Sequence, residues 1–381
     1  MRIRDFGVKQ LLSATTTPLA SIFGSGFLVI VPILAGAVGP YSVLAMAGVC
    51  ALAFAMGSVI RFNIRHAEPV LAADPSEMTL SFERASDLAL VIAYIISVCL
   101  YIHILAAFVL TGLGTMTPLH DDLLTTAVIA AITLVGVING LDGLSFLERW
   151  ALLVTFAIIT LLLGSFAVYD LGLASAATGI QLPKLPEQSG WTMLTLVAGT
   201  LIVVQGFETP RYLGATFDAE TRVKASRLSQ LISSAVYITF VALALPMVVT
   251  LGGNYDDDSL IALAKTAAIW LPIPLIIAAA LSQFAAAVAD TLAASGNLAE
   301  TTHDHLKVRY AYVIVGAGAI ALTWTADTLE ILALASRAFA FYYFLQCLVA
   351  MSVAQSMHQR LLIAPIAMAM AFVTVFAVPA G

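Results

Sequence analysis

The chain has 381 residues and a formal net charge of −6; 61% of the residues are hydrophobic and 10% are charged. Soluble domains usually carry about 25% charged residues, because a water-facing surface needs them, so the composition excludes an ordinary soluble protein and predicts a membrane protein. The sequence has no basic stripe with interleaved aromatic residues, so nucleic-acid binding is not predicted.

A bilayer core about 30 Å thick needs about 20 apolar residues per helix. The first apolar run, 19–38, follows three basic residues as in a signal peptide, but it is long enough to span a membrane and a second span follows almost at once. We therefore interpret it as a retained transmembrane helix. Eleven segments meet the length requirement, centred near Val29, Val49, Cys99, Ala131, Ile159, Leu201, Val241, Ala278, Gly316, Ala340 and Met370.

These segments predict an all-α, polytopic fold with a single membrane transport domain, residues 1–381. The domain would consist of a first repeat at about 17–171, a second at about 193–354 and an extra helix at about 361–380. The segment 218–231 alternates charged and apolar residues at helical spacing, which predicts a short interfacial helix before the seventh span.

Lysine and arginine predict the orientation. With the N-terminus in the cytoplasm, the outer loops hold only Lys184 and Lys265. The inner segments hold thirteen basic residues: Arg2, Arg4, Lys9, Arg61, Arg65, Arg84, Arg149, Arg222, Lys224, Arg227, Lys307, Arg309 and Arg360. Under the positive-inside rule, this bias predicts a multi-pass protein of the cell membrane with its C-terminus outside.

Two spans contain residues that interrupt helices. The first holds Gly24, Ser25 and Gly26, and the sixth holds Gly206 followed by Pro210. Proline removes a backbone donor and glycine loosens a helix, so both spans are predicted to unwind at membrane depth. The freed amide and carbonyl groups can bind a carboxylate, an amine or a cation. The alternative interpretation is close helix packing through small residues.

The two interruptions lie at corresponding positions of two halves. Gly206 follows Gly24 by 182 residues, and the same offset carries Leu147 and Glu148 onto Leu329 and Glu330. Spans one to five and six to ten are therefore predicted to be repeats. Because five is an odd number, the second repeat would be inverted in the membrane, as in many transporters.

Several short motifs resemble the amino acid–polyamine–organocation (APC) superfamily: 23–27, the 39–40 link, 68–69, 82–84 and 206–208. The resemblance implies a leucine-transporter-type fold, with substrate held between the broken spans one and six and helices three and eight. It also implies that the glycine-serine-glycine segment receives a carboxylate and that Phe207 and Glu208 lie at a gate. Common members have twelve spans, and several proton-coupled relatives carry a lysine in the fifth span, which 150–168 lacks.

Charged groups inside a membrane are costly and point to function. His103, Glu208, Arg211, Asp290 and Arg337 fall in predicted spans. The two acids and two arginines would be neutral together, which predicts mutual pairing, with Arg211 and Arg337 as the candidates for buried ion pairs. Arg211 has the alternatives of an inner gate or an exposed, snorkelling position. His103 is either a proton relay or a structural histidine.

Asp290 is the main candidate for cation or proton coupling. Thr291 and Ser295 would add oxygen ligands for sodium. The substrate-binding candidates are Gly24, Ser25, Gly26, His103, Gly206, Phe207, Glu208 and Thr209.

The leading functional hypothesis is cation-coupled import of an amino acid or similar small organic solute. The alternatives are an exchanger of amino acids or amines and a membrane-embedded solute sensor. A channel is less favoured, because broken inverted repeats indicate a closed site. The sequence has no nucleophile–base constellation and no cofactor motif, so neither an enzyme nor a cofactor is predicted. Sodium is a candidate coupling ion. The sequence leaves open the substrate, sodium or proton coupling, symport or exchange, and the oligomeric state.

Overall fold

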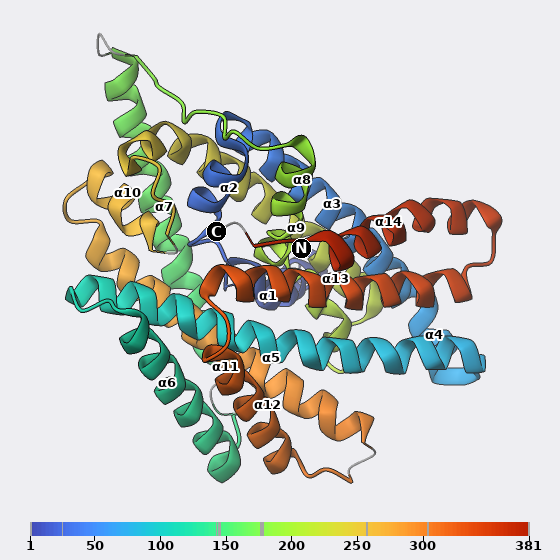
Figure 1. Ribbon diagram of the computed structural model, residues 1–381. Coiled ribbons are helices and arrows are strands. Elements are labelled where there is room, and N and C mark those ends of the chain that lie inside the picture. Colours follow the sequence, from blue (N-terminus) through green and yellow to red (C-terminus); the bar gives the residue numbers. More distant parts are fainter. Residues whose placement is uncertain are drawn as a thin grey trace.

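A computed structural model describes residues 2–24, 26–141, 143, 146–175, 179–256, 258–302 and 305–379 (Figure 1). All regular elements in these ranges are helical. The α-helices are α1 (Arg2–Gly24), α2 (Ile30–Val38), α3 (Ser42–Phe62), α4 (Glu68–Ala73), α5 (Glu77–Leu113), α6 (Pro118–Asn139), α7 (Phe146–Ser175), α8 (Gly190–Ala198), α9 (Ala219–Ala244), α10 (Ser259–Ala267), α11 (Pro272–Thr301), α12 (Val308–Thr323), α13 (Thr328–Val353) and α14 (Met357–Phe376).

Short helical turns connect some of them. They are η1 (Gly39–Tyr41), a π-helical turn η2 (Asn63–Ala67), η4 (Leu201–Val204), η5 (Thr209–Leu213) and η6 (Leu245–Leu251).

The predicted all-α polytopic fold is confirmed. Within the described ranges, eight helices are long and apolar enough to cross a membrane, or nine if Gly190–Ala198 and Leu201–Leu213, bent by 43°, form one span. The first and ninth predicted spans do not qualify separately, because α2 runs on into α3 and α12 has only 16 residues. The count of eleven therefore stays a prediction.

Both predicted interruptions are confirmed. The first span ends as α1 at Gly24 and resumes as α2 at Ile30, while the sixth passes from α8 through η4 to η5. Gly26 has φ +139° and Gly206 has φ +121°. Side chains with a Cβ rarely adopt such angles, so glycine allows the chain to leave the helix at both places.

The predicted interfacial helix at 218–231 is wrong as a separate element. Asp218 caps the N-terminus of α9, accepting a hydrogen bond from the Thr221 amide at 3.0 Å, and the helix continues without a break to Ala244. The hydrogen bonds from Thr221 lower the pKa of the Asp218 carboxyl. The charged stretch continues the span because Arg222, on its inner face, pairs with Glu68 instead of facing lipid.

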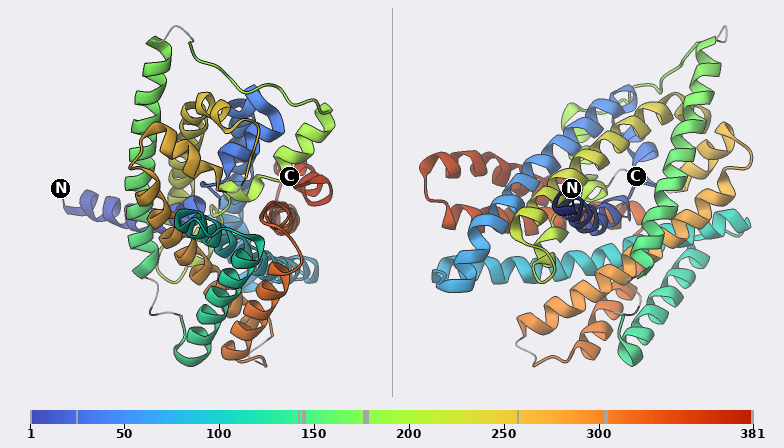
Figure 2. Two further views of the ribbon diagram at one scale, coloured as in Figure 1. Left: turned by 60° about the vertical axis from the view of Figure 1, so that its left-hand side comes forward. Right: turned by 180° about the vertical axis from the view of Figure 1, so that it is seen from behind.

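Helices at corresponding positions of the two predicted repeats pack against each other. The long helix α5 crosses the molecule and packs against α11 and α13, while α3 packs on α9 and α6 on α12 (Figure 1). In a five-plus-five arrangement, α3, α5 and α6 are the counterparts of α9, α11 and α12. Pairing between counterparts fits a pseudo-two-fold axis, although the repeat boundaries stay a prediction. The N-terminal end of α1 projects away from the body of the molecule (Figure 2).

Candidate functional site

The two helix breaks cross each other, and one tyrosine joins them. The Tyr237 hydroxyl of α9 lies 2.9 Å from the carbonyl oxygen of Ile22 and 2.8 Å from that of Val203. Ile22 lies at the end of α1 and Val203 in η4. Carbonyl groups freed by unwinding are costly to bury without a partner, and Tyr237 offers one hydroxyl to both breaks at once.

The glycines at the breaks allow close backbone contact. A Cβ on Gly206 would lie 2.6 Å from Ser21 Oγ and 2.7 Å from the Ile22 nitrogen. A Cβ on Gly26 would lie 2.9 Å from Val203 Cγ2, and one on Gly24 would lie 3.0 Å from Ala286 Cβ. These glycines, proposed from sequence as substrate-binding, therefore pack one break against the other and against α11. Ser25, the third candidate of the first span, lies outside the described residues.

Glu208, in the break of the sixth span, is fully buried. Its carboxylate accepts hydrogen bonds from Gln205 Nε2 at 2.5 Å, the Gly206 amide at 3.0 Å and the Tyr343 hydroxyl at 2.8 Å. Phe207 stacks on the Tyr343 ring, with centroids 5.0 Å apart. Two of these donors lie within the break itself, and the third, Tyr343, links the break to α13.

A cavity of about 410 Å³ lies beside the breaks. Its walls come from α1, α5, α7, η5 and α11, and it is lined by Thr17, Ala20, Ser21, Phe23, Tyr94, Tyr101, Ala151, Leu152, Thr155, Thr209, Tyr212, Leu213, Ser282, Ala285, Ala286, Ala289, Asp290, Leu292, Ala293, Gly296, Asn297 and Glu300. Among these lining residues are two carboxylates and no lysine, arginine or histidine. A mostly apolar cavity with a few polar groups is typical of a small-molecule site.

Asp290 lies in the wall between α11 and α5, where Ser97 donates a hydrogen bond to its carboxylate. Of the other two coupling candidates, Thr291 donates to the Ala287 carbonyl within α11 at 2.7 Å. The Ser295 hydroxyl is fully buried and has no hydrogen-bond partner among the described residues. Neither side chain lines the cavity, so the structure brings only Asp290 to it.

A second cavity, of about 560 Å³, adjoins the first and shares Tyr212, Asn297 and Glu300 with it. Two buried ion pairs lie at its edge. Arg211 pairs with Glu83 at 2.6 Å, and Arg222 pairs with Glu68 through two nitrogen–oxygen contacts. We call this second cavity the vestibule, and the end of the molecule where it lies the α1 side. The first cavity continues into the vestibule through the three residues that they share.

Arg211 forms a buried ion pair as expected, but the expected pairing among the candidate residues themselves is wrong. Arg211 pairs with Glu83, which was not among the candidates. Arg337 is exposed, and its Nε donates to the Thr374 carbonyl of α14 at 2.9 Å. Arg337 lies within α13 as expected, but on a face turned toward α14 and the surface.

His103 was proposed as a substrate-binding residue, but it does not line the cavity. It is 2% exposed, and its Nδ1 lies 3.0 Å from Asp121 Oδ2 at the start of α6. Thr209 does line the cavity, and its hydroxyl donates to the Gly206 carbonyl at 2.9 Å.

The sequence and the fold have counterparts among known proteins. A model of an APC superfamily transporter family matches residues 4–378. This chain belongs to the APC superfamily. A relative from Aquifex aeolicus (strain VF5), described as an uncharacterized protein, is 37% identical over 358 residues, which cover 93% of this chain and 86% of the relative. The resemblance inferred from the break motifs is therefore confirmed, and the chain is a membrane transporter.

Solved structures confirm that this APC superfamily chain has a transporter fold. Two crystal structures of a manganese transporter from Eremococcus coleocola, each of a single-residue variant, match with a TM-score of 0.57 and 11% identity. The match covers 96% of this chain and 85% of the manganese transporter. At this identity the likeness concerns the fold alone.

Sequence reasoning missed most of the side chains that line the cavity of this transporter. Tyr94 and Tyr101 of α5 and Asn297 of α11 are uncharged, so a search for charged residues and glycines does not find them. The same holds for Tyr237 of α9, which lies at the breaks and not in the cavity wall. Tyrosine and asparagine residues inside the spans next to the breaks are the one sequence signal that would have identified these side chains.

Proposed function

We propose that this transporter moves a small organic solute carrying an amino group, such as an amino acid or an amine, by alternating access. The observation that carries the proposal is the cavity between the broken spans and α5 and α11, whose lining includes two carboxylates and no basic side chain. A volume of about 410 Å³ suits a solute of a few to about a dozen non-hydrogen atoms with some water.

The charge of the lining favours a cationic group. Asp290 lies in the wall next to the tyrosines, and Glu300 lies at the end that joins the vestibule. In addition, α1 ends at the break with its C-terminus, whose partial negative charge favours an amine or a cation, while α2 begins there with its partially positive N-terminus. An amino acid has both charges, so its two ends would match the two half-helix ends.

Access to the cavity is one-sided in this conformation, which supports alternating access. On the α1 side the cavity continues into the vestibule. On the other side of the cavity, a separate space between the first-span break, α7 and α11 has a volume of only about 10 Å³ and is lined mainly by apolar side chains such as Phe27, Ile159 and Leu275. Hydrogen bonds from Thr111 to Asp258 and from Gln188 to the Ala37 carbonyl tie elements together at that end. With the N-terminus in the cytoplasm, this is an inward-open state.

Coupling to a cation rests on Asp290. Its carboxylate faces both the cavity and Ser97, so a sodium ion or a proton that binds there would change the charge of the site. Movement of that charge together with the solute would drive accumulation. Thr291 and Ser295 do not line the cavity, so the coupling site proposed here is smaller than the one proposed from the sequence.

The test is uptake into proteoliposomes. A panel of labelled amino acids and amines, with Mn²⁺ as a further solute, is offered under a sodium gradient and, separately, under a proton gradient. Accumulation of an organic solute against its gradient supports the coupled importer, and counterflow alone supports an exchanger. Binding without flux indicates a sensor. Uptake of Mn²⁺ without any organic solute would overturn the proposal.

A further inference from the structure

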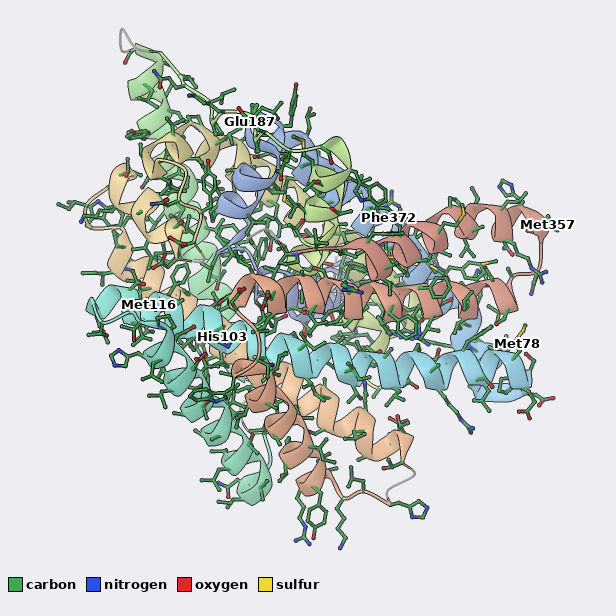
Figure 3. The ribbon with its side chains drawn as sticks, viewed as in Figure 1. Met78, His103, Met116, Glu187, Met357 and Phe372 are labelled. Carbon is green, nitrogen blue, oxygen red and sulfur yellow. The ribbon has the colours of Figure 1, made fainter. Side chains whose placement is uncertain are left out.

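A group of potential metal ligands lies where α6 starts beside α5. His103 is on α5, and Asp121 and Asp122 are in the first turns of α6. One ligand atom from each of the three residues lies within 4.8 Å of the other two, and His103 Nδ1 is 3.0 Å from Asp121 Oδ2. Figure 3 shows His103 on the part of α5 that α6 approaches.

Chain geometry brings these residues together from 18 positions apart. Gly114, with φ +69°, ends α5 in the left-handed conformation, and Thr117 caps α6 with a hydrogen bond from the His120 amide at 3.2 Å. The tight turn folds the first turns of α6 back along the end of α5. The placement of the group is thus a consequence of the fold and not of a contiguous motif.

Polar atoms in and next to the group have no partner. Asp121 is 7% exposed and His103 is 2% exposed. Even so, Asp121 Oδ1 and the hydroxyl of Thr125, one helical turn after Asp121, make no hydrogen bond to any described residue. A buried carboxylate oxygen without a partner is costly, and such an atom in a folded protein calls for a water, a ligand or an ion.

We propose that His103, Asp121 and Asp122 form a binding site for a divalent transition-metal ion, separate from the transport cavity. An imidazole nitrogen with two carboxylates is a ligand set for Zn²⁺, Mn²⁺ or Co²⁺, and three protein ligands leave positions open for water. Two aspartates and a neutral histidine carry a charge that a divalent cation balances.

The position sets this site apart from the transport site. None of the three ligands lines the central cavity or the vestibule. The ion would tie α6 to α5, the helix that carries Tyr94, Ser97 and Tyr101 toward the cavity. The metal therefore acts as a clamp between two helices and is not the transported solute.

The experiment measures metal binding to the full-length protein in detergent after treatment with a chelator. Titration with Co²⁺ is followed by visible absorption and titration with Zn²⁺ by thermal unfolding. We expect one Co²⁺ per chain at this site and a rise in Tm with Zn²⁺. His103→Gln and Asp121→Asn should each weaken Co²⁺ binding at least tenfold and abolish the rise in Tm.

Two variants serve as controls. His120→Gln removes an exposed histidine of the same helix and should leave Co²⁺ binding unchanged. Asp290→Asn alters the transport cavity and should also leave it unchanged, which separates this site from any metal bound in the cavity. Asp122 is only half-buried, so Asp122→Asn tests the site if the other two ligand variants fail to fold. Absence of saturable binding by the unaltered protein, or unchanged binding in the ligand variants, would overturn the proposal.

Discussion

Glu208 and Asp290 are both buried carboxylates, and their surroundings give them different roles. Glu208 is fully enclosed and accepts hydrogen bonds from two side chains and one backbone amide. Asp290 is 8% exposed, borders the cavity, and accepts a hydrogen bond from Ser97. Glu208 therefore belongs to the internal structure of the sixth-span break, whereas Asp290 is within reach of a solute or ion in the cavity.

Replacement of Asp290 by Asn tests this assignment, because it keeps the shape of the side chain and removes its charge. We expect uptake to fall at least tenfold while Tm changes little. If sodium is the coupling ion, the remaining uptake should lose its sodium dependence. If a proton is the coupling ion, the uptake should instead lose its pH dependence. Normal uptake with normal ion dependence would show that Asp290 has no part in coupling.

At the scale of elements, the crossing of the two breaks requires the absence of a side chain at Gly206. Gly206→Ala adds a Cβ 2.6 Å from Ser21 Oγ at a φ of +121°. Steric overpacking and the unfavourable backbone angle should together destabilise the protein by about 2–4 kcal/mol.

Thermal unfolding in detergent measures the effect, with Gly164→Ala as the matched control. Gly164 lies within α7 with nothing within 4 Å of its Cβ position, so alanine there should leave Tm unchanged or raise it slightly. An equal response of the two variants would refute the close contact between the breaks.

The ion pairs at the vestibule link elements that are far apart in the chain. Glu83 of α5 forms an ion pair with Arg211 of η5, and the Arg211 side chain is 6% exposed. Glu83→Gln would leave a buried guanidinium without an anion, which should cost about 3–5 kcal/mol.

The surface pair of Arg65 and Glu220 is the control for that change. Its side chains are 46% and 58% exposed, so Glu220→Gln should change the free energy of unfolding by less than about 1 kcal/mol. Chemical or thermal unfolding of both variants compares the two costs, and similar values would argue against a structural role for the Glu83–Arg211 pair.

At the scale of the whole molecule, the cavity continues into the vestibule, and the proposal of alternating access predicts that it communicates with one side of the membrane only. Cys50, Cys99 and Cys347 are buried, so the unaltered protein offers little background for thiol labelling. Ala293→Cys places a thiol in the cavity and Ala278→Cys places one beyond the breaks, in the nearly closed space.

A membrane-impermeant thiol reagent should label Ala293→Cys from the cytoplasmic face at least tenfold faster than Ala278→Cys from either face. A transported solute should slow the labelling of Ala293→Cys. Labelling of Ala293→Cys only from outside would reverse the orientation inferred from the basic residues. Fast labelling of both variants would indicate a continuous pore.

The sequence by itself determined the membrane class, the helical fold, the family and the positions of both breaks. Hydropathy depends only on the residues of one segment, and a glycine or proline interrupts the helix in which it lies. Both features can therefore be predicted from the sequence without knowledge of the tertiary structure. The break motif around Gly24 and the one around Gly206 are of this kind.

The tertiary structure alone decided which side chains meet. Hydropathy gives the depth of a residue but not the rotation of its helix, and for this reason Arg337 was expected in the interior and lies at the surface. His103 was expected at the substrate site for the same reason, and α5 turns it toward Asp121. Asp290 lines the cavity, but the residue that donates a hydrogen bond to it, Ser97 of α5, lies 193 positions away in the sequence. Such long-range pairs depend on how the helices pack, which no single span encodes.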